Sequence, residues 1–372
     1  MDAKTEIKEL DVLVLQGGGA LGAYQAGAFE TLFASGRHTD WVAGVSIGAI
    51  NAALIAGNPA GRRVERLRMF WERISQATAA FQLPPGFAAR GIFNELSAGT
   101  VMATGVPGFF QPRFPPAFLM PPGSAGATSF YDTAPLRDTL LDLVDFDYLN
   151  DGPTRFSTGA VNVETGNMIW FDSAHDRIGP EHVMASGALP PGFPAVEIDG
   201  QFYWDGGLVS NTPLQYVYDE RGPDDLCVFQ VDLFSARGPL PASVWDIEAR
   251  AKDIRFSSRT RLNTDMLCEM QTAHVAGRRL YEKLPPELRD DPDARALLTN
   301  RHDPKITVAH LIYRQTPHET QSKDYEFSRS SMLDHWKAGA QDTATTLAHP
   351  EWIARHDNPA QVRIFDLADA RP

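Results

Sequence analysis

Ser46 lies in a pattern that is typical of a nucleophile, G-x-S-x-G, which reads GVSIG from Gly44 to Gly48. The residues before it, WVAG, favour a short buried strand, and IGAINAALIAG after it favours an apolar helix. On such a strand-to-helix turn a serine is exposed, and the flanking glycines let strand and helix approach closely. The alternative is a serine that only caps the helix. Because the pattern stands at this turn, we predict that Ser46 is a nucleophile for acyl transfer.

A glycine-rich turn precedes this serine, in the stretch VLVLQGGGALG. A strand-like run before it and a helical pattern after it leave the N–H groups of the turn able to face a negative charge. Gly17, Gly19 and Gly22 also fit the G-x-G-x-x-G fingerprint of dinucleotide binding, which needs an acid at the end of the second strand. Asp40 lies before that strand, and Ser46 stands at its end. A non-catalytic nucleotide-binding module is therefore the less favoured alternative.

A third motif, YWDGGLVSNTP, places Asp205 at the end of a predicted strand, followed by Gly206 and Gly207. A D-G pair often does no more than close a hairpin. Here the next residues are LVSNTPL rather than a returning strand, so the aspartate can be held against a neighbouring loop. Its ordinary pKa of about 3.9 makes it a weak base, but burial beside an apolar pocket would raise that pKa.

The three motifs, in the order GGGALG, GVSIG and DGG, resemble the patatin-like phospholipase family. The resemblance includes ASGALPPGFP and extends over roughly Val12–Pro213. It implies a Ser–Asp dyad, with Ser46 as nucleophile and Asp205 as base, and an acyl-enzyme intermediate. It also implies that the Gly17–Gly19 turn, with Gly18 at its centre, is the oxyanion hole. The negative charge that this turn faces would then develop on an acyl carbonyl oxygen during the reaction.

The same resemblance implies a lipid or other acyl ester as substrate, and this chemistry requires no metal or cofactor. Many family members carry Lys or Arg in the glycine motif where this chain has Leu21. That departure removes a positive charge near the site, so a preference for anionic head groups is not implied. A carboxylesterase for other esters, such as hydroxyalkanoate oligomers, is the alternative.

A histidine triad is the rival to the dyad, since many hydrolases with this elbow use the order Ser, Asp or Glu, His. The chain has ten histidines, among them His182, His274 and His310. In that fold, however, the elbow follows several strands, whereas Ser46 has one clear strand before it. His182 stands beside Glu181 at a predicted helix start, which favours a surface position. The dyad is the favoured interpretation.

The elements that position these motifs follow from the hydrophobic periodicity. The runs VLVLQ and WVAGVS are typical of strands buried on both faces, and each precedes an apolar helical pattern. This order predicts a three-layer α/β/α fold with a mostly parallel central sheet. We expect a hairpin that turns near Gly166, and two further strands at QFYWDGG and LCVFQVDLF. Residues 1–238 form the predicted core, and 239–372 a mainly helical extension packed on it, with one strand at KITVAHLIYR.

Residues 82–126 are predicted to be an irregular, lid-like insertion. Its stretch GVPGFFQPRFPPAFLMPPG mixes prolines with Phe109, Phe110, Phe114 and Phe118, which excludes a regular helix there. This segment could contact lipid, or it could simply cover its own domain.

Charge and composition limit the partners. The 47 acidic against 34 basic residues give a net charge of −13, which argues against nucleic acid and against steady electrostatic binding to an anionic membrane. The apolar runs are too short to span a bilayer, and the polar start MDAKTEIKELD does not resemble a signal peptide. Cys227 and Cys268 show no paired spacing for a metal or a disulfide. We therefore expect a cytoplasmic protein that makes transient contact with a lipid surface.

Overall fold

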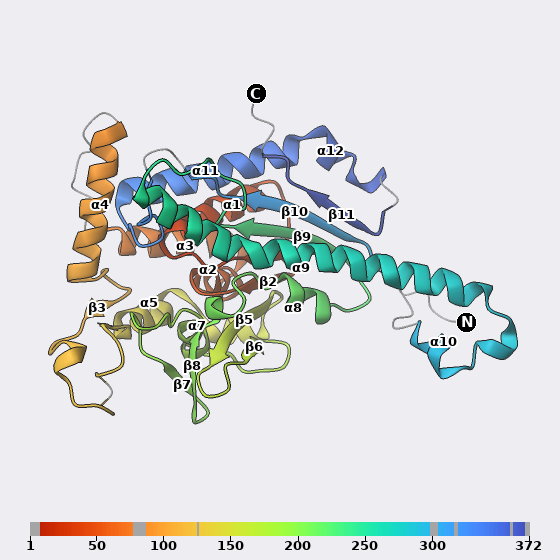
Figure 1. The fold of residues 1–372 in the computed structure, drawn as a ribbon, viewed down its shortest axis with the longest axis horizontal. Coiled ribbons are helices and arrows are strands. Elements are labelled where there is room, and N and C mark those ends of the chain that lie inside the picture. Colours follow the sequence, from red (N-terminus) through yellow and green to blue (C-terminus); the bar gives the residue numbers. More distant parts are fainter. Residues whose placement is uncertain are drawn as a thin grey trace.

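The computed structural model describes residues 8–76, 87–124, 126–297, 304–315, 319–357 and 360–368. A nine-stranded sheet runs through it in the order β11-β10-β9-β1-β2-β5-β8-β7, with β6 paired to β5 (Figure 1). Its strands are β1 (Glu9–Leu15), β2 (Trp41–Gly44), β5 (Arg155–Asn162), β6 (Met168–Asp172), β7 (Val196–Ile198), β8 (Gln201–Asp205), β9 (Asp225–Asp232), β10 (Ile306–Ile312) and β11 (Val362–Phe365). The pairings from β11 to β5 are parallel, whereas β6, β8 and β7 pair antiparallel. The predicted, mostly parallel sheet is confirmed.

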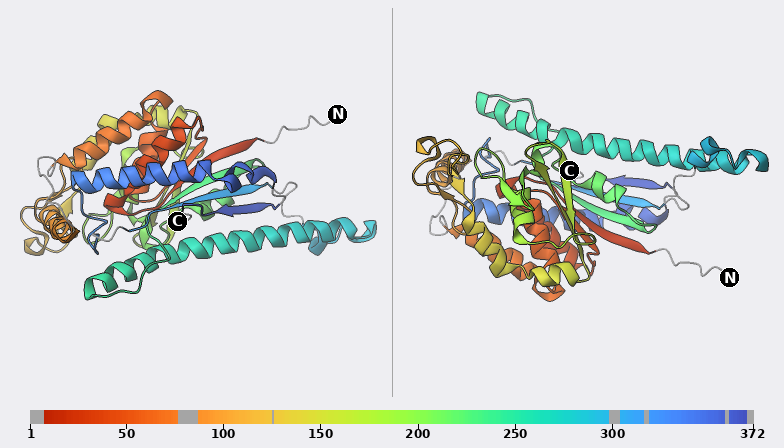
Figure 2. Two further views of the ribbon diagram at one scale, coloured as in Figure 1. Left: turned by 90° about the horizontal axis from the view of Figure 1, so that it is seen from above. Right: turned by 90° about the horizontal axis from the view of Figure 1, so that it is seen from below.

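Helices cover both faces of this sheet. One face carries α1 (Ala23–Ala34), α2 (Ile47–Ala56), α3 (Arg63–Ile74), α5 (Ala134–Leu143), α7 (Pro180–Ser186) and α11 (Arg329–Ala348). The opposite face carries α8 (Leu214–Asp219) and the long α9 (Val244–Lys283), which Figure 2 shows on the other side of the strands from α1 and α11. Successive residues of β1 bury their side chains in different layers, with Leu13 and Leu15 in one and Val12 and Val14 in the other. The three-layer α/β/α prediction is therefore confirmed.

The chain beyond residue 238 is closely joined to the rest. Strand β10 forms where KITVAHLIYR predicts it, and β11, which has no clear sequence signal, extends the same sheet. Helix α11 lies against α1 at a crossing that has no room for side chains. A Cβ on Gly27 would lie 1.9 Å from the carbonyl oxygen of Trp336, and one on Gly339 would lie 1.9 Å from that of Tyr24. A domain boundary at residue 238 stays a prediction.

The predicted insertion differs from expectation in its first half. Residues 82–86 lie outside the described residues, but α4 (Phe87–Thr104) is an 18-residue helix, so an irregular structure was the wrong prediction there. Its sequence, FAARGIFNELSAGTVMAT, contains no proline and several good helix formers, whereas the prolines that suggested irregularity all follow Gly105. Only the later half is irregular, apart from β3 (Gln111–Pro112), which pairs with β4 (Tyr131–Asp132), and one 3-10 turn.

The remaining helices are short: α6 (Phe146–Asp151), α10 (Pro292–Ala296) and α12 (Pro350–Ile353). Among the helices that the structure describes, none combines the length and the apolar character needed to cross a membrane.

Candidate active site

Ser46 occupies a strained turn between β2 and α2. Its φ of 57° and ψ of −123° lie in a region that a non-glycine residue rarely adopts. Its side chain makes no capping hydrogen bond to α2, so the structure does not support the alternative of a simple helix cap. The strain instead holds the hydroxyl at the carboxyl end of a central parallel strand.

The elbow glycines are required by close backbone contacts. A Cβ on Gly44 would lie 2.2 Å from the carbonyl oxygen of Gly48, and one on Gly48 would lie 2.3 Å from that of Leu15. Gly22, at the end of the glycine turn, packs against Ile47, where a Cβ would approach Cγ1 to 2.5 Å. These glycines bring β1, β2 and α2 together tightly enough to place the two motifs side by side.

Asp205 ends strand β8 and is almost completely buried. The Gly207 N–H donates a hydrogen bond to its Oδ1 at 2.7 Å, and the Ser46 hydroxyl is near enough to lower the pKa of its carboxylate. Burial raises the pKa of Asp205 to about 6, although the Gly207 N–H and the Ser46 hydroxyl both oppose that rise. Gly206 leaves no room for a side chain, because a Cβ would lie 2.4 Å from the carbonyl oxygen of Gly159. The structure thus brings the predicted serine and aspartate together at one cavity.

The glycine turn lies beside Ser46, and a Cβ on Gly17 would come within 3.1 Å of the serine Cβ. Its N–H groups differ in their availability. The Gly17 N–H donates to the Asn211 carbonyl oxygen at 3.1 Å, and the Ala20 N–H donates to that of Asp324 at 2.8 Å. Within the ranges that the structure describes, the N–H groups of Gly18 and Gly19 have no protein acceptor. Only these two of the three predicted donors are available to an oxyanion.

A cavity of about 600 Å³ opens from this point. Ser46 and Asp205 line it together with the glycine turn, and most of its wall is aromatic or aliphatic. Its phenylalanines are Phe109, Phe110, Phe130, Phe193, Phe234, Phe256 and Phe327. No Lys, Arg or His is found among the described residues of this wall. The cavity can therefore hold an acyl chain next to Ser46, Asp205 and the N–H groups of Gly18 and Gly19.

The histidines of the rival triad lie elsewhere. His182 is buried in α7, where its Nδ1 accepts a hydrogen bond from the Gly179 N–H at 2.9 Å, so the expected surface position is wrong. Its ring packs against Phe171, an aromatic contact that the flanking sequence does not reveal. His310 is on β10, and His274 is on α9. Neither of them lines the cavity that contains Ser46.

Two residues that the sequence does not single out hold these motifs in place. Ser186 accepts a hydrogen bond from the Ser46 N–H at 3.0 Å and donates one to the Gly159 carbonyl oxygen at 2.7 Å. Asn211 Nδ2 donates to the Gly17 carbonyl oxygen at 2.9 Å. Both residues lie within conspicuous stretches, ASGALPPGFP and DGGLVSNTP, but only the fold shows what their side chains contact.

No group of three or more His, Cys, Asp or Glu side chains suited to a metal ion occurs within the described part of the chain.

Comparison with known families gives two matches. A family model described as patatin-like phospholipase matches residues 13–218, and a second, described as patatin phospholipase, matches residues 254–359. None of the curated proteins compared with the chain matches it significantly.

Two solved structures resemble the chain distantly. VipD from Legionella pneumophila is 12% identical, with a TM-score of 0.36 over 100% of this chain and 75% of that one. ExoU from Pseudomonas aeruginosa, in complex with SpcU, is 16% identical, with a TM-score of 0.31 over 92% of this chain and 78% of that one. Likeness at this level carries no functional argument.

Proposed function

The chain belongs to the patatin-like phospholipase family, and on this premise we propose that it hydrolyses lipid esters with Ser46 as nucleophile and Asp205 as base. The observation that carries the proposal is the placement of the strained Ser46 and the buried Asp205 together in the wall of one apolar cavity, where the Ser46 hydroxyl acts on the pKa of the Asp205 carboxylate. A nucleophile beside a base of raised pKa is the arrangement that covalent acyl transfer needs.

The reaction proceeds in two stages. Ser46 Oγ attacks the ester carbonyl carbon while its proton passes to Asp205, and the carbonyl oxygen becomes an oxyanion. The N–H groups of Gly18 and Gly19 donate to that oxyanion, and each such donor contributes about 3 kcal/mol to transition-state stability. Asp205 then protonates the leaving alcohol, which leaves an acyl-enzyme. A water molecule gives a proton to Asp205 and attacks the acyl carbon. The bond between that carbon and Ser46 Oγ then breaks while Asp205 returns the proton to Oγ, which releases the carboxylic acid and restores Ser46 and the Asp205 carboxylate.

The residues of the cavity wall indicate which class of substrate the site can accept. Because none of its described residues is a Lys, Arg or His, no cation there compensates the phosphate of a phospholipid. Leu21, at the position where many family members are basic, is fully buried. These observations favour an acyl chain in the cavity and keep an uncharged ester as the second candidate. Hydrolysis rates on phosphatidylglycerol, phosphatidylcholine and a diacylglycerol with identical acyl chains, in the same detergent, distinguish the two.

Contact with a lipid surface would occur at the exposed apolar residues around the cavity. Phe130 and Leu189 both line the cavity and are exposed, and Phe114 and Phe118 in the proline-rich segment are still more exposed. Exposed apolar side chains in the wall of a ligand cavity, such as Phe130 and Leu189, are suited to an interface with lipid, and the exposed Phe114 and Phe118 offer further apolar surface.

The nucleophile assignment is tested by Ser46→Ala. We expect this variant to keep its melting temperature, to lose ester hydrolysis and to lose labelling by a fluorophosphonate, with the label in the unaltered protein located on Ser46 by peptide mass spectrometry. Ser210→Ala is a matched control, because this half-buried serine lies just beyond the turn that follows Asp205 and should not affect labelling. Retained turnover in purified Ser46→Ala would refute the assignment.

A further inference from the structure

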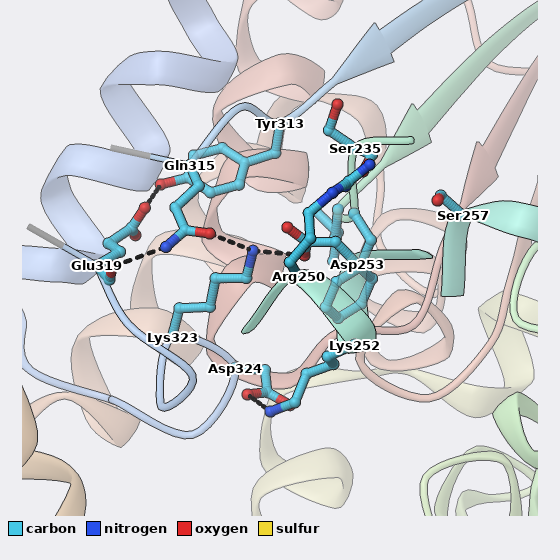
Figure 3. A network of polar contacts seen from close by, with 12 residues as sticks. Ser235, Arg250, Lys252, Asp253, Ser257, Tyr313, Gln315, Glu319, Lys323 and Asp324 are labelled. Carbon is cyan, nitrogen blue, oxygen red and sulfur yellow. Dashed lines mark hydrogen bonds and ion pairs between the residues drawn. The ribbon is translucent and has the colours of Figure 1, made fainter. Parts of the chain in front are cut away.

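Two identical dipeptides, far apart in the sequence, pair crosswise in the structure. Lys252 and Asp253 lie on α9, and Lys323 and Asp324 lie in the segment between β10 and α11. The Lys252 Nζ is 2.6 Å from the Asp324 Oδ1, and the Lys323 Nζ is 2.6 Å from the Asp253 Oδ1 (Figure 3). We call these four residues the crossed pairs.

The crossed pairs hold residues 323–324 against α9 through one buried ion pair and one partly exposed ion pair. The Lys323–Asp253 pair is almost completely buried, and the Lys323 Nζ also donates to the Gln315 Oε1 at 3.1 Å. The Lys252–Asp324 pair is about three-quarters buried, and the Lys252 Nζ also donates to the Gln321 carbonyl oxygen at 2.8 Å. Ion pairs of limited exposure, with further hydrogen bonds, hold geometry more firmly than surface pairs do.

The backbone of Asp324 reaches the glycine turn. Its carbonyl oxygen accepts the hydrogen bond from the Ala20 N–H, and a Cβ on Gly19 would lie 2.0 Å from the same oxygen. Ala20 directly follows Gly18 and Gly19, the two proposed oxyanion donors. Because Gly19 has a φ of 54°, the direction of these N–H groups depends on how the turn is held. The carbonyl oxygen of Asp324 therefore contacts the stretch of backbone that sets the direction of the Gly18 and Gly19 N–H groups.

A second contact from α9 supports the residue before the turn. The carbonyl oxygen of Phe256, one helical turn after Lys252, accepts a hydrogen bond from the Gln16 Nε2 at 3.3 Å. Phe256 also lines the acyl cavity, as do Tyr325 and Phe327, which follow Asp324 in the chain. Helix α9 and the segment it holds thus contact both the oxyanion turn and the acyl-binding wall.

We propose that the crossed pairs are a positioning device for the oxyanion turn, which makes Lys252 and Asp324 positioning residues of the hydrolase. The two ion pairs hold residues 323–324 against α9. The backbone carbonyl of Asp324 then fixes the direction of the Gly18 and Gly19 N–H groups. The inference rests on the proposed function, and it extends the catalytic machinery beyond residues 13–218, the part matched by the patatin-like phospholipase model.

The test breaks the more exposed pair and then rebuilds it. Asp324→Asn keeps the backbone carbonyl and removes the charge, and Lys252→Asp places like charges opposite each other. Each is expected to lower kcat on a soluble short-chain ester about tenfold with little change in KM, less than the roughly 10²–10³-fold effect of losing a whole donor. The double variant Lys252→Asp with Asp324→Lys restores opposite charges and should recover most of kcat. Asp11→Asn is the matched control, since Asp11 pairs with Arg37 at the same 2.6 Å, at the far end of β1.

A second readout does not depend on turnover. Hydrogen exchange of the Ala20 amide should accelerate in both single variants and slow again in the double variant. Unchanged kcat and unchanged exchange in the single variants would overturn the proposal, as would a lowered melting temperature with kcat intact, which would show a merely structural pair. A double variant as slow as either single one would also overturn it. Failure of the proposed function looks different, because Ser46→Ala would then retain activity.

Discussion

The raised pKa of Asp205 predicts the pH dependence of hydrolysis. Asp205 accepts the Ser46 proton only when it is ionised, and burial raises its pKa from 3.8 to about 6. The free enzyme should therefore show a kcat/KM that is half-maximal near pH 6 and level above about pH 7. Below the midpoint, kcat/KM should fall about tenfold per pH unit, because the ionised fraction falls by that factor. A carboxylate with an ordinary pKa would keep full activity at pH 5.

The assay uses a soluble short-chain ester, so that the state of a lipid interface does not change with pH. Product acid is measured after quenching from pH 4.5 to 8.5, and the rate of fluorophosphonate labelling is measured in parallel. Labelling needs the same base but no product release, so both profiles should share one midpoint. A profile that is level down to pH 5 would refute the reasoning. So would a midpoint near 7 that moved when a histidine was replaced.

The remaining predictions concern stability, the glycine turn and the exposed phenylalanines. Because the folded-state pKa of Asp205 is raised, its contribution to stability is lost as the pH rises from about 4 to about 6. Asp205→Asn should therefore increase the free energy of unfolding at pH 8 by up to about 3 kcal/mol and leave it unchanged at pH 4. Urea unfolding at both pH values checks this, and a lower free energy of unfolding at pH 8 would contradict it. Gly19→Ala should abolish most of kcat and lower the melting temperature, because its methyl would meet a carbonyl oxygen at 2.0 Å. Gly36→Ala, at a φ of 82° with open space around it, should incur only about 1 kcal/mol of backbone strain and leave kcat unchanged, so equal activity loss in both variants would argue against the steric explanation. Phe114→Ser with Phe118→Ser should reduce activity on vesicles but not on soluble esters, since these rings are 96% and 79% exposed and burying each yields on the order of 2 kcal/mol; equal loss on both substrates would contradict a lipid contact.

The sequence could single out Ser46, Asp205 and the glycine turn, which the structure brings to one cavity, because each lies in a short contiguous motif. A strained elbow needs glycine close on both sides of Ser46, and an aspartate held at a strand end needs a turn after Asp205. Both requirements are met within a few residues. The sheet was equally accessible, because a strand buried on both faces leaves an apolar run such as VLVLQ.

The parts that sequence could not give depend on contacts between distant residues. Asp324 meets the glycine turn through its backbone carbonyl, which every residue type carries, so no side chain marks the position. The burial of the four phenylalanines could not be predicted either. Phe109 and Phe110 are buried while Phe114 and Phe118 are exposed, although all four lie in one proline-rich stretch of uniform composition. Strand β11 is four residues long and pairs with β10 alone in the described sheet, which leaves little pattern to detect.

The place of Asp324 in the chain has a consequence for synthesis. Ser46 and the glycine turn leave the ribosome early, yet the carbonyl oxygen on Ala20 belongs to a residue that is translated later. At about 5–20 residues per second, that interval is on the order of 15–55 s. Strand β9, the partner of β1 on the side away from Ser46, also arrives within this interval. A nascent chain therefore carries Ser46 throughout this interval before the carbonyl oxygen of Asp324 reaches the glycine turn, and the proposed mechanism predicts that ester hydrolysis begins only after the sheet and α9 have closed around the site.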